Sequence, residues 1–381
     1  MKILLIGGGA QGRAALFDLL RFSDCSVVVA DNNLESITSF IDSQNLDRSR
    51  IILVEVDANN KESLLPLFRD VDIVLDLLPT IFRKFMTELA IETKTNIVNT
   101  SFHSHVAHLA NDAALAGITV MPEAGLDPGI DLILAGHGIS CFDEVYEFSS
   151  ACGGIPNKDA CTNPLNYKIS WNFEGVLSAY KRPGDIIIDG EVVSVSSDNV
   201  FDFSREIDVE GVGLMDIYPN GHTSTYASLL NLSSTIKNMG RYTLRWSGHS
   251  EFWRKIVALG LIDDEPVLGI SPRQYLAKVL EPKLQYESGE SDLVVLRNEF
   301  KGVINGESKT LVQTLVDERD LETGLMAMNR TVGFTASIVT LMILNNIISE
   351  TGLLSPARDV PFDLFLVEIE KRNIKIKQKF V

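Results

Sequence analysis

The chain begins with an apolar strand pattern, Lys2 to Ile6, that runs directly into Gly7-Gly8-Gly9-Ala10-Gln11-Gly12 and then into a helix pattern. A second apolar strand pattern, from 27 to 30, ends on Asp31. A backbone that turns sharply against a pyrophosphate needs glycine at positions 7, 9 and 12, because a side chain would block the turn, the phosphate or the packing of the helix. Strand, glycine loop and helix in this order predict a dinucleotide-binding site. Ala10 and Gln11 would place their amides at the positive end of the helix dipole.

Asp31 indicates which dinucleotide is bound. It lies 19 residues after Gly12, at the distance where a carboxylate accepts hydrogen bonds from the adenosine ribose hydroxyls. The same carboxylate repels a 2′-phosphate, and neither Asn32 nor Asn33 supplies a cation. We therefore expect NAD as the cofactor, with NADP disfavoured. The alternative reading is that Asp31 only caps the next helix, since aspartate is also a good N-cap residue.

Length and charge narrow the class of protein. A chain of 381 residues is long enough for two domains. Its net charge of −17 repels nucleic acid and acidic lipid headgroups, so we expect a small-molecule substrate, no nucleic-acid partner and no membrane partner. No secretory signal pattern is visible at the N-terminus, which favours a cytoplasmic protein, and we expect a homodimer. The apolar stretch from 331 to 344 contains several hydroxyl residues and predicts a buried helix rather than a membrane span.

Strand and helix patterns alternate regularly through the first 122 residues. Further strand-like runs lie at 51–56, 72–77, 96–99 and 118–121, with helix-length segments between them. This alternation is typical of an α/β fold, here a Rossmann-type doubly wound parallel sheet whose ligand lies beyond the carboxyl ends of the strands. Side chains at such ends are candidates for the cofactor wall. They are Asp57, Leu78, Pro79, Thr100 and Ser101.

After residue 122 the pattern changes to longer strands and fewer helices. Asp189-Gly190 is a hairpin signal between two apolar runs, and 293–300 with 310–316 predicts a second strand pair. Helices are expected from about 250 to 259 and 273 to 280, and a long one from about 324 to 349. We therefore expect a mixed α+β substrate domain over 123–349, with a segment from about 350 to 381 that completes the nucleotide domain.

The sequence offers little to a metal ion. Its four cysteines lack the paired spacing of a zinc site, and the only histidine cluster, at 103, 105 and 108, has no nearby cysteine. We expect no metal and no disulfide.

Two further segments combine turn-forming and reactive residues. The first is Glu123-Ala124-Gly125-Leu126-Asp127-Pro128-Gly129-Ile130-Asp131, at the expected junction of the domains. The second is Cys152-Gly153-Gly154-Ile155-Pro156, in which the glycines permit close approach to a ligand. Together with the glycine loop and four later motifs, they resemble the saccharopine dehydrogenase family, including saccharopine reductases and lysine 6-dehydrogenases, across nearly the whole chain. The later motifs are NPLNYKISW at 163–171, TLRWSG at 243–248, LGLID at 259–263 and TGLMAMNRTVGF at 323–334.

The resemblance implies NAD(P)-linked chemistry at a carbon bonded to nitrogen. Hydride loss from such a carbon needs an unprotonated amine and yields an iminium that water attacks, so a proton-handling group must stand close. Asp127 is the first candidate for that catalytic role and Cys152 the second. The alternative for each is structural, since aspartate before proline shapes turns and cysteine often fills space. Candidate substrate-binding residues are Phe102, Gly153, Gly154, Arg245 and Arg330.

The chain also departs from the family pattern. Eukaryotic reductases of the family carry Tyr-Pro-Asn-Arg-Asp-Ser, whereas this chain has Tyr218-Pro219-Asn220-Gly221-His222-Thr223 and lacks an arginine suited to a carboxylate. Phe102 stands where an aromatic hydroxyl is often present. Three functions stay open. They are saccharopine cleavage to glutamate and aminoadipate semialdehyde, oxidative deamination of lysine, and NAD sensing without catalysis.

Overall fold

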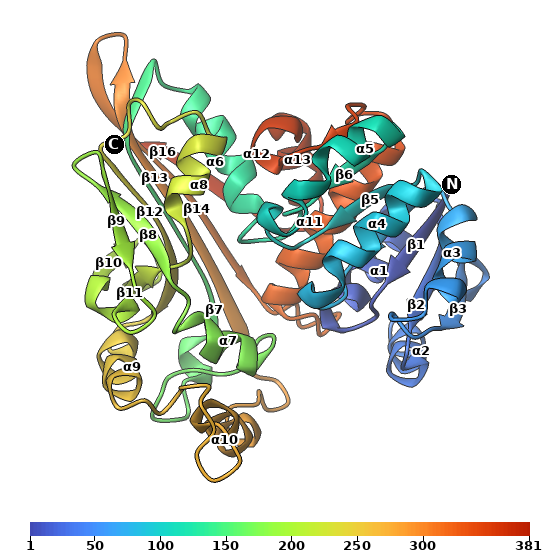
Figure 1. The fold of residues 1–381 in the computed structure, drawn as a ribbon, viewed down its shortest axis with the longest axis horizontal. Coiled ribbons are helices and arrows are strands. Elements are labelled where there is room, and N and C mark those ends of the chain that lie inside the picture. The colour runs from blue at the N-terminus through green and yellow to red at the C-terminus, as the bar shows by residue number, and fades with distance from the viewer. The chain divides into compact units, whose positions relative to one another are not determined.

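The computed structural model describes residues 1–381, which divide into two compact units. The first unit contains Met1–Gly136, Glu322–Leu325 and Asn329–Ile374, and the second contains His137–Leu321, Met326–Met328 and Lys375–Val381. Figure 1 follows the chain from blue to red through both units. Each unit therefore combines segments that are far apart in the sequence.

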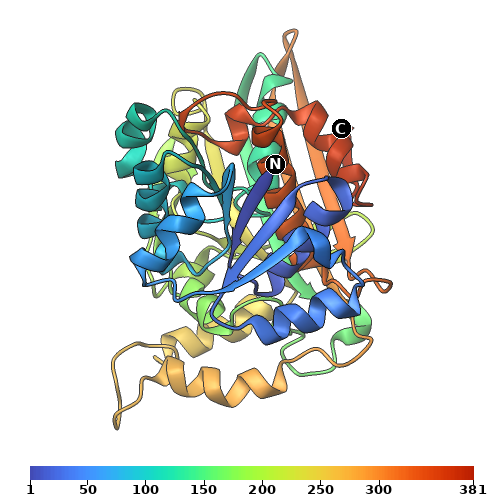
Figure 2. The same cartoon turned by 90° about the vertical axis from the view of Figure 1, so that its right-hand side faces the viewer.

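The first unit is built on a seven-stranded sheet in the order β15-β6-β5-β4-β1-β2-β3, and every neighbouring pair is parallel. The chain order reverses between β1 and β4, which is the switch point where such sheets bind ligands. The blue strands of this sheet are seen well in Figure 2. The predicted Rossmann-type sheet is confirmed. Its strands are β1 (Lys2–Ile6), β2 (Ser26–Asp31), β3 (Ile51–Glu55), β4 (Ile73–Asp76), β5 (Asn96–Asn99), β6 (Thr119–Met121) and β15 (Gly352–Leu353).

Local capping residues set the bounds of several helices in this unit. The Asn33 side chain accepts a hydrogen bond from Glu35 N at the start of α2, and Asn60 does the same for Glu62 at the start of α3. Gly117 ends α5 in the left-handed conformation. The helices are α1 (Ala10–Phe22), α2 (Leu34–Ser43), α3 (Lys61–Arg69), α4 (Arg83–Thr93), α5 (Ala110–Ala116), α12 (Pro356–Asp359) and α13 (Phe362–Glu370), while α6 (Ile130–Ser140) and α11 (Ala327–Leu344) are divided between the units.

Helix α11 is long and apolar enough to cross a membrane by length and composition, but 83% of it is buried inside the structure. It packs closely on α1. A Cβ atom at Gly333 would lie 2.7 Å from the carbonyl oxygen of Gln11 and 2.9 Å from the Ala14 side chain. Burial of this kind is typical of a core helix, which is the structure that the apolar stretch predicted.

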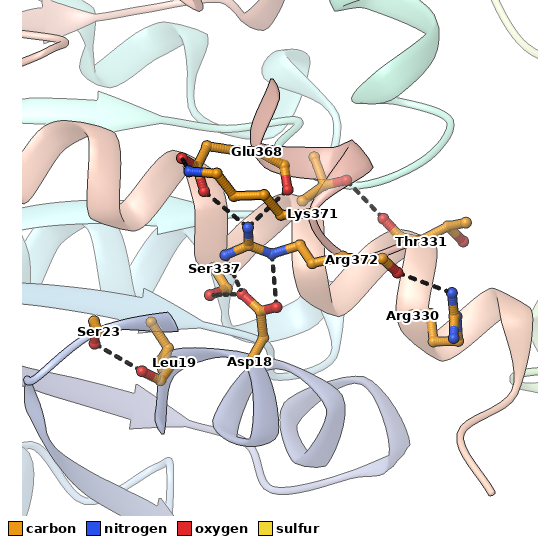
Figure 3. Close-up of polar contacts among 10 residues, drawn as sticks. Asp18, Leu19, Ser23, Arg330, Thr331, Ser337, Glu368, Lys371 and Arg372 are labelled. Carbon is orange, nitrogen blue, oxygen red and sulfur yellow. Dashed lines mark hydrogen bonds and ion pairs between the residues drawn. The ribbon is translucent and has the colours of Figure 1, made fainter. Parts of the chain in front are cut away.

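A buried ion pair fastens the C-terminal segment to α1 (Figure 3). Both Asp18 and Arg372 have fully buried side chains, and Arg372 Nε donates to Asp18 Oδ1 at 2.7 Å while its Nη2 donates to Oδ2 at 2.9 Å. Ser337 on α11 donates to the same carboxylate at 2.6 Å, and Glu368 on α13 accepts from Arg372 Nη1 at 2.9 Å. Three helices and the C-terminal segment therefore meet at one charged cluster.

The second unit is built on a nine-stranded mixed sheet in the order β10-β11-β12-β7-β13-β14-β16, with β8 and β9 branching from β12. β7 and β12 are parallel, and the other pairs are antiparallel. The mixed architecture predicted for this region is confirmed. Its strands are β7 (Glu144–Pro156), β8 (Gly184–Ile188), β9 (Glu191–Val195), β10 (Arg205–Val209), β11 (Gly213–Pro219), β12 (Asn238–Trp246), β13 (Asp292–Ile304), β14 (Glu307–Glu318) and β16 (Ile376–Phe380).

Both predicted strand pairs are present. Asp189 and Gly190 have positive φ angles and join β8 to β9, as a two-residue hairpin with a primed turn requires. Leu296 pairs with Leu315 in the β13–β14 hairpin. The helices of this unit are α7 (Phe173–Ala179), α8 (Thr223–Leu229), α9 (His249–Ala258) and α10 (Pro272–Leu280). Ser271 and Gln274 form a capping box at the start of α10.

The division into units differs from the predicted domain boundaries. Residues 123–136 belong to the first unit, because the start of α6 is apolar and packs there. Residues 329–349 also belong to the first unit, since α11 packs on α1. Residues 375–381 belong to the second unit, because β16 pairs with β14. These assignments depend on contacts between distant segments, which a change of sequence pattern cannot reveal.

Candidate functional site

Each of the three glycines in the loop after β1 has a different structural role. Gly7 has a φ of +93°, and a Cβ atom there would lie 2.9 Å from the Leu77 backbone. A Cβ atom at Gly12 would lie 1.9 Å from the carbonyl oxygen of Gly7, so α1 packs directly on the loop. A Cβ atom at Gly9 would have no neighbouring atom within 4 Å, which leaves its backbone open to a ligand. The loop thus has the tight turn, the open face and the close helix packing of a pyrophosphate cradle.

Helix α1 adds an electropositive end to this cradle. Its N-cap is Gly9, which has no capping side chain, and its first turn has no acidic residue. Ala10 is exposed and Gln11 is half-buried. The amides of the first turn and the helix dipole are therefore available to a phosphate.

Asp31 at the end of β2 is held against the loop by two backbone amides. Gly8 N donates to Oδ2 at 2.7 Å, and Asn33 N donates to Oδ1 at 2.8 Å. The N-cap of α2 is Asn33, so the alternative role of Asp31 as the cap of that helix is wrong. Each carboxylate oxygen keeps a further acceptor site for a ribose hydroxyl.

The end of β4 forms one wall beside the cradle, since the Leu77 backbone lies against Gly7. Leu78 and Pro79 follow directly, and Leu78 N donates to Asp76 Oδ1 at 3.1 Å. Asp57, by contrast, is exposed and follows β3, which β2 separates from β1. Its Oδ1 accepts from Asn59 N at 2.9 Å, and this hydrogen bond lowers the pKa of the carboxyl. The contacts of Asp57 are those of a turn residue.

A buried arginine that sequence analysis missed connects the strand ends. Arg83 at the start of α4 forms an ion pair with Asp76 and donates to Leu78 O at 2.8 Å and to Ser101 Oγ at 2.9 Å. Burial raises the pKa of Asp76, and the Arg83 guanidinium opposes that rise. No local pattern marks Arg83, because the residues it joins lie on two different strand ends.

The segment that contains Asp127 folds back on the end of β5. Ala124 N donates to Asn99 O at 2.9 Å and Glu123 N to Ser101 O at 3.0 Å, and a Cβ atom at Gly125 would lie 3.4 Å from Thr100 Cβ. The structure thus places Thr100 and Ser101 beside this segment. Phe102 follows, with its ring centroid 6.3 Å from that of His105.

A tight turn then presents Asp127, which is half-buried. Gly125 N donates to Pro128 O at 3.1 Å, and Gly129 N donates to the buried Asp131 carboxylate at 2.7 Å. The Asp127–Pro128 peptide bond is cis. Asp131 therefore supports the turn, whereas Asp127 lies at its apex.

Cys152 is a buried residue in the middle of β7, in the second unit. It pairs with Thr243 on β12, which pairs in turn with Tyr218 on β11. Paired residues on neighbouring strands point to the same side of a sheet, so these three side chains form one row. A Cβ atom at Gly153 would lie 2.1 Å from Leu244 O, and one at Gly154 would lie 2.3 Å from the Met328 side chain. Close backbone packing therefore requires Gly153, whereas a side chain at Gly154 would displace the flexible end of Met328.

Arg245 is a buried cation in the same unit. It makes no ion pair there, its Nη1 donates to Leu244 O at 2.8 Å, and its Nε has no hydrogen-bond partner. Tyr167 lies below it, with the guanidinium carbon 5.3 Å from the ring centroid. Burial raises the pKa of Tyr167 to about 12, and burial together with Arg245 holds the pKa of His249 well below its usual value. Tyr167 and His249 are therefore neutral near pH 7, and the guanidinium is left without a neutralising carboxylate.

Arg330, the other predicted carboxylate binder, lies in the first unit on α11. Its Nη2 donates to the carbonyl of Arg372 at 3.2 Å, and its guanidinium carbon lies 5.7 Å from the Phe334 ring centroid. These contacts join it to the C-terminal segment, as Figure 3 shows. The two arginines thus belong to different units.

No group of three or more histidine, cysteine or acidic side chains is arranged to hold a metal ion. His103 and His105 lie in a short 3₁₀ turn, and all four cysteines are free thiols.

Family models match almost the entire chain. The model described as the saccharopine dehydrogenase NADP binding domain matches residues 3–121, and the one described as the saccharopine dehydrogenase C-terminal domain matches residues 125–374.

Curated relatives and solved structures agree with these matches. The chain is 28% identical to the saccharopine dehydrogenase [NADP(+), L-glutamate-forming] of Saccharomyces cerevisiae, over 100% of this chain and 99% of that protein. It is also 28% identical to the protein of the same name from Pyricularia oryzae, with the same coverage. The apo structure of the yeast enzyme superposes with a TM-score of 0.87 at 27% identity, over 100% of this chain and 99% of that one. A homospermidine synthase from Legionella pneumophila has a TM-score of 0.70 at 11% identity, over 100% of this chain and 91% of that one, which shows likeness of fold alone.

Proposed function

The chain belongs to the saccharopine dehydrogenase family, and from this premise we propose that it oxidises saccharopine at its secondary amine to release L-glutamate and aminoadipate semialdehyde. The observation that carries the proposal is the end-to-end match with relatives that are named for this reaction, over 99% of their length. The glycine cradle supports it, because its open Gly9 and close-packed Gly12 suit a nicotinamide dinucleotide.

A nicotinamide ring, when bound, accepts hydride from the carbon bonded to the substrate nitrogen. The residues of this chain must then handle protons. We assign to Asp127 the removal of a proton from the substrate amine, which it releases to solvent after hydride transfer. Asp127 then takes a proton from the water that adds to the iminium carbon and returns it to the nitrogen that leaves with glutamate. Cys152 lies on the same face of its sheet as two hydroxyl residues, Thr243 and Tyr218. We propose that the Cys152 side chain contacts the reacting carbon of the substrate.

Arg245 is our candidate for binding a substrate carboxylate. A buried guanidinium without a carboxylate partner is costly to the folded protein, because its charge has been removed from water. An incoming carboxylate would both neutralise it and accept from Nε, which has no hydrogen-bond partner. The neutral Tyr167 and His249 beside it supply no competing negative charge.

We propose that NAD is the preferred cofactor, although the yeast and Pyricularia relatives are named for NADP(+). The support is Asp31, whose carboxylate is fixed by Gly8 N and Asn33 N at the end of β2. A 2′-phosphate near that carboxylate would meet like charge, whereas two ribose hydroxyls would donate to it.

Asp31→Ser tests the cofactor assignment. Loss of the carboxylate should weaken NAD and relieve the repulsion of NADP, so we expect the ratio of their Kd values to shift by roughly tenfold or more toward NADP. Both Kd values would be measured by fluorescence titration. Asp57→Ser, which removes an exposed carboxylate at the end of the next strand, is the matched control and should leave the ratio unchanged. An unchanged ratio in Asp31→Ser would mean that Asp31 does not read the ribose.

The reaction itself is tested by following reduced-cofactor absorbance with saccharopine and, separately, lysine, each with NAD and with NADP. Glutamate release is assayed in parallel. Turnover of saccharopine with stoichiometric glutamate is expected. Turnover of lysine alone would assign the chain to side-chain deamination, and no turnover of either would favour a nucleotide sensor.

A further inference from the structure

The loop that follows β11 is held in place by the segment leading into β8. A Cβ atom at Gly184 would lie 2.1 Å from Gly221 O, and Asp185 N donates to the same carbonyl at 3.2 Å. The buried Asp185 carboxylate accepts from Ser224 N at 2.7 Å and from Ser224 Oγ at 2.9 Å, and it lies 2.9 Å from His222 Nδ1. Residues 220–224 therefore have a fixed position relative to β8.

This arrangement brings an arginine to the loop from outside it. Arg182, just before β8, donates from Nη1 to Asn220 Oδ1 at 3.1 Å. The next residue of the loop is Gly221, whose φ of +77° suits a residue without a side chain. The loop has no side chain at position 221, where a Cβ atom would have no neighbouring atom within 4 Å, and Asn220 holds the guanidinium of Arg182 beside this position.

Asn220 is close to the row that contains Cys152. Its backbone N donates to Arg241 O at 2.8 Å, and Arg241 lies two residues before Thr243, the partner of Cys152. Arg245 lies two residues after Thr243. With a rise of about 3.3 Å per residue, the backbone positions of Arg241 and Arg245 lie roughly 7 Å from the Cys152 row, one on each side of it.

The row at Arg241 is polar across four strands. Arg241 pairs with Ser150, Ser150 with Asn298 and Asn298 with Gln313. All four side chains are buried, and they lie on the same side of the sheet as Cys152 because Ser150 and Cys152 are two residues apart. Buried polar rows of this kind suit a polar ligand better than a hydrophobic one. Tyr218 belongs to the Cys152 row. Burial raises the pKa of Tyr218, and the positive charges of Arg245 and Arg182 both counter this rise, so both charges act on one hydroxyl of the Cys152 row.

We propose that Arg182, positioned by Asn220, binds a second carboxylate of the substrate, so that it and Arg245 together select molecules with a carboxylate on each side of the reacting amine. The inference rests on the proposed function and adds Arg182 as the residue that restricts the enzyme to substrates with two such carboxylates. Saccharopine carries carboxylates on both sides of its secondary amine, whereas lysine carries only one.

Arg182→Met tests the proposal by steady-state kinetics with purified full-length protein. Loss of a charge-assisted bond to the substrate should raise KM for saccharopine by roughly 10- to 100-fold and leave Kd for the dinucleotide unchanged. Arg182→Lys should recover part of the affinity because it keeps the charge. Lys181→Met is the matched control, since Lys181 pairs with Asp198 and Asp263 instead, and its KM should equal that of the unaltered protein.

Asn220→Ala separates positioning from direct binding. If Asn220 acts only by holding Arg182, its KM increase should be smaller than that of Arg182→Met, and the double variant should match Arg182→Met alone. An unchanged saccharopine KM in Arg182→Met, in a preparation whose unaltered protein oxidises saccharopine, would overturn this inference and leave the proposed function standing. A failure of the unaltered protein to oxidise saccharopine would overturn the proposed function instead.

Discussion

Arg372→Met should destabilise the first unit by about 3 to 5 kcal/mol, because it leaves the Asp18 carboxylate buried without its partner. Both side chains are fully buried, and Arg372 donates two hydrogen bonds to Asp18. The guanidinium also lies 4.1 Å from the Phe22 ring centroid, so packing on α1 is lost as well. For a unit of this size the loss corresponds to a fall in Tm of about 10 °C.

Differential scanning calorimetry would measure this loss, with urea unfolding as a second probe. Lys371→Met is the control, since Lys371 pairs only with Glu368 at the surface and should change stability by less than about 1 kcal/mol. The double variant Asp18→Leu with Arg372→Met removes both charges and should be more stable than Arg372→Met alone. A double variant that is less stable would contradict the buried-charge explanation.

Asp127→Asn should lower kcat by roughly 100-fold or more and change dinucleotide affinity by less than about twofold. An amide cannot accept the proton that leaves the substrate amine, and general base catalysis typically contributes a factor of this size. The substitution keeps the shape of the side chain at the apex of a turn that is closed by Gly125, Pro128 and Asp131.

Stopped-flow reduction of the cofactor, together with a binding titration, separates these two effects. Asp112→Asn, which neutralises an exposed carboxylate on α5 of the same unit, should leave both kcat and affinity unchanged. If Asp127→Asn keeps normal turnover, the carboxylate has no part in proton transfer, and Cys152→Ser becomes the next variant to examine.

Local patterns predicted the nucleotide sheet because its elements are defined by neighbours in sequence. A side chain at Gly7 would clash with the Leu77 backbone and one at Gly12 with the Gly7 carbonyl, in agreement with the spacing of glycines in the loop. The hairpin at Asp189-Gly190 was equally local, since two positive φ angles suit those two residue types.

Contacts between distant residues were beyond the reach of such patterns. Asp18 and Arg372 are separated by 354 positions, and neither Asp18 within α1 nor Arg372 in the turn after α13 looks unusual among its neighbours in sequence. In the sequence Arg83 is indistinguishable from any other helical arginine, although in the structure it contacts Asp76, Leu78 and Ser101. Only the structure excludes Asp31 as the N-cap of α2, because Asn33 occupies that position. The assignment of Arg245 and Arg330 to different units likewise needed the packing of the chain.

The interleaved composition of the two units has a consequence for biosynthesis. The first 136 residues leave the ribosome early, but the partners that cover α1, namely α11 and Arg372, are translated only after the whole nine-stranded sheet except β16. A nascent chain therefore carries an incomplete nucleotide unit with exposed apolar surface through most of its synthesis. The second sheet gains its last edge strand only with residues 376–380. Each unit therefore stays incomplete until the last segments of the polypeptide have been made.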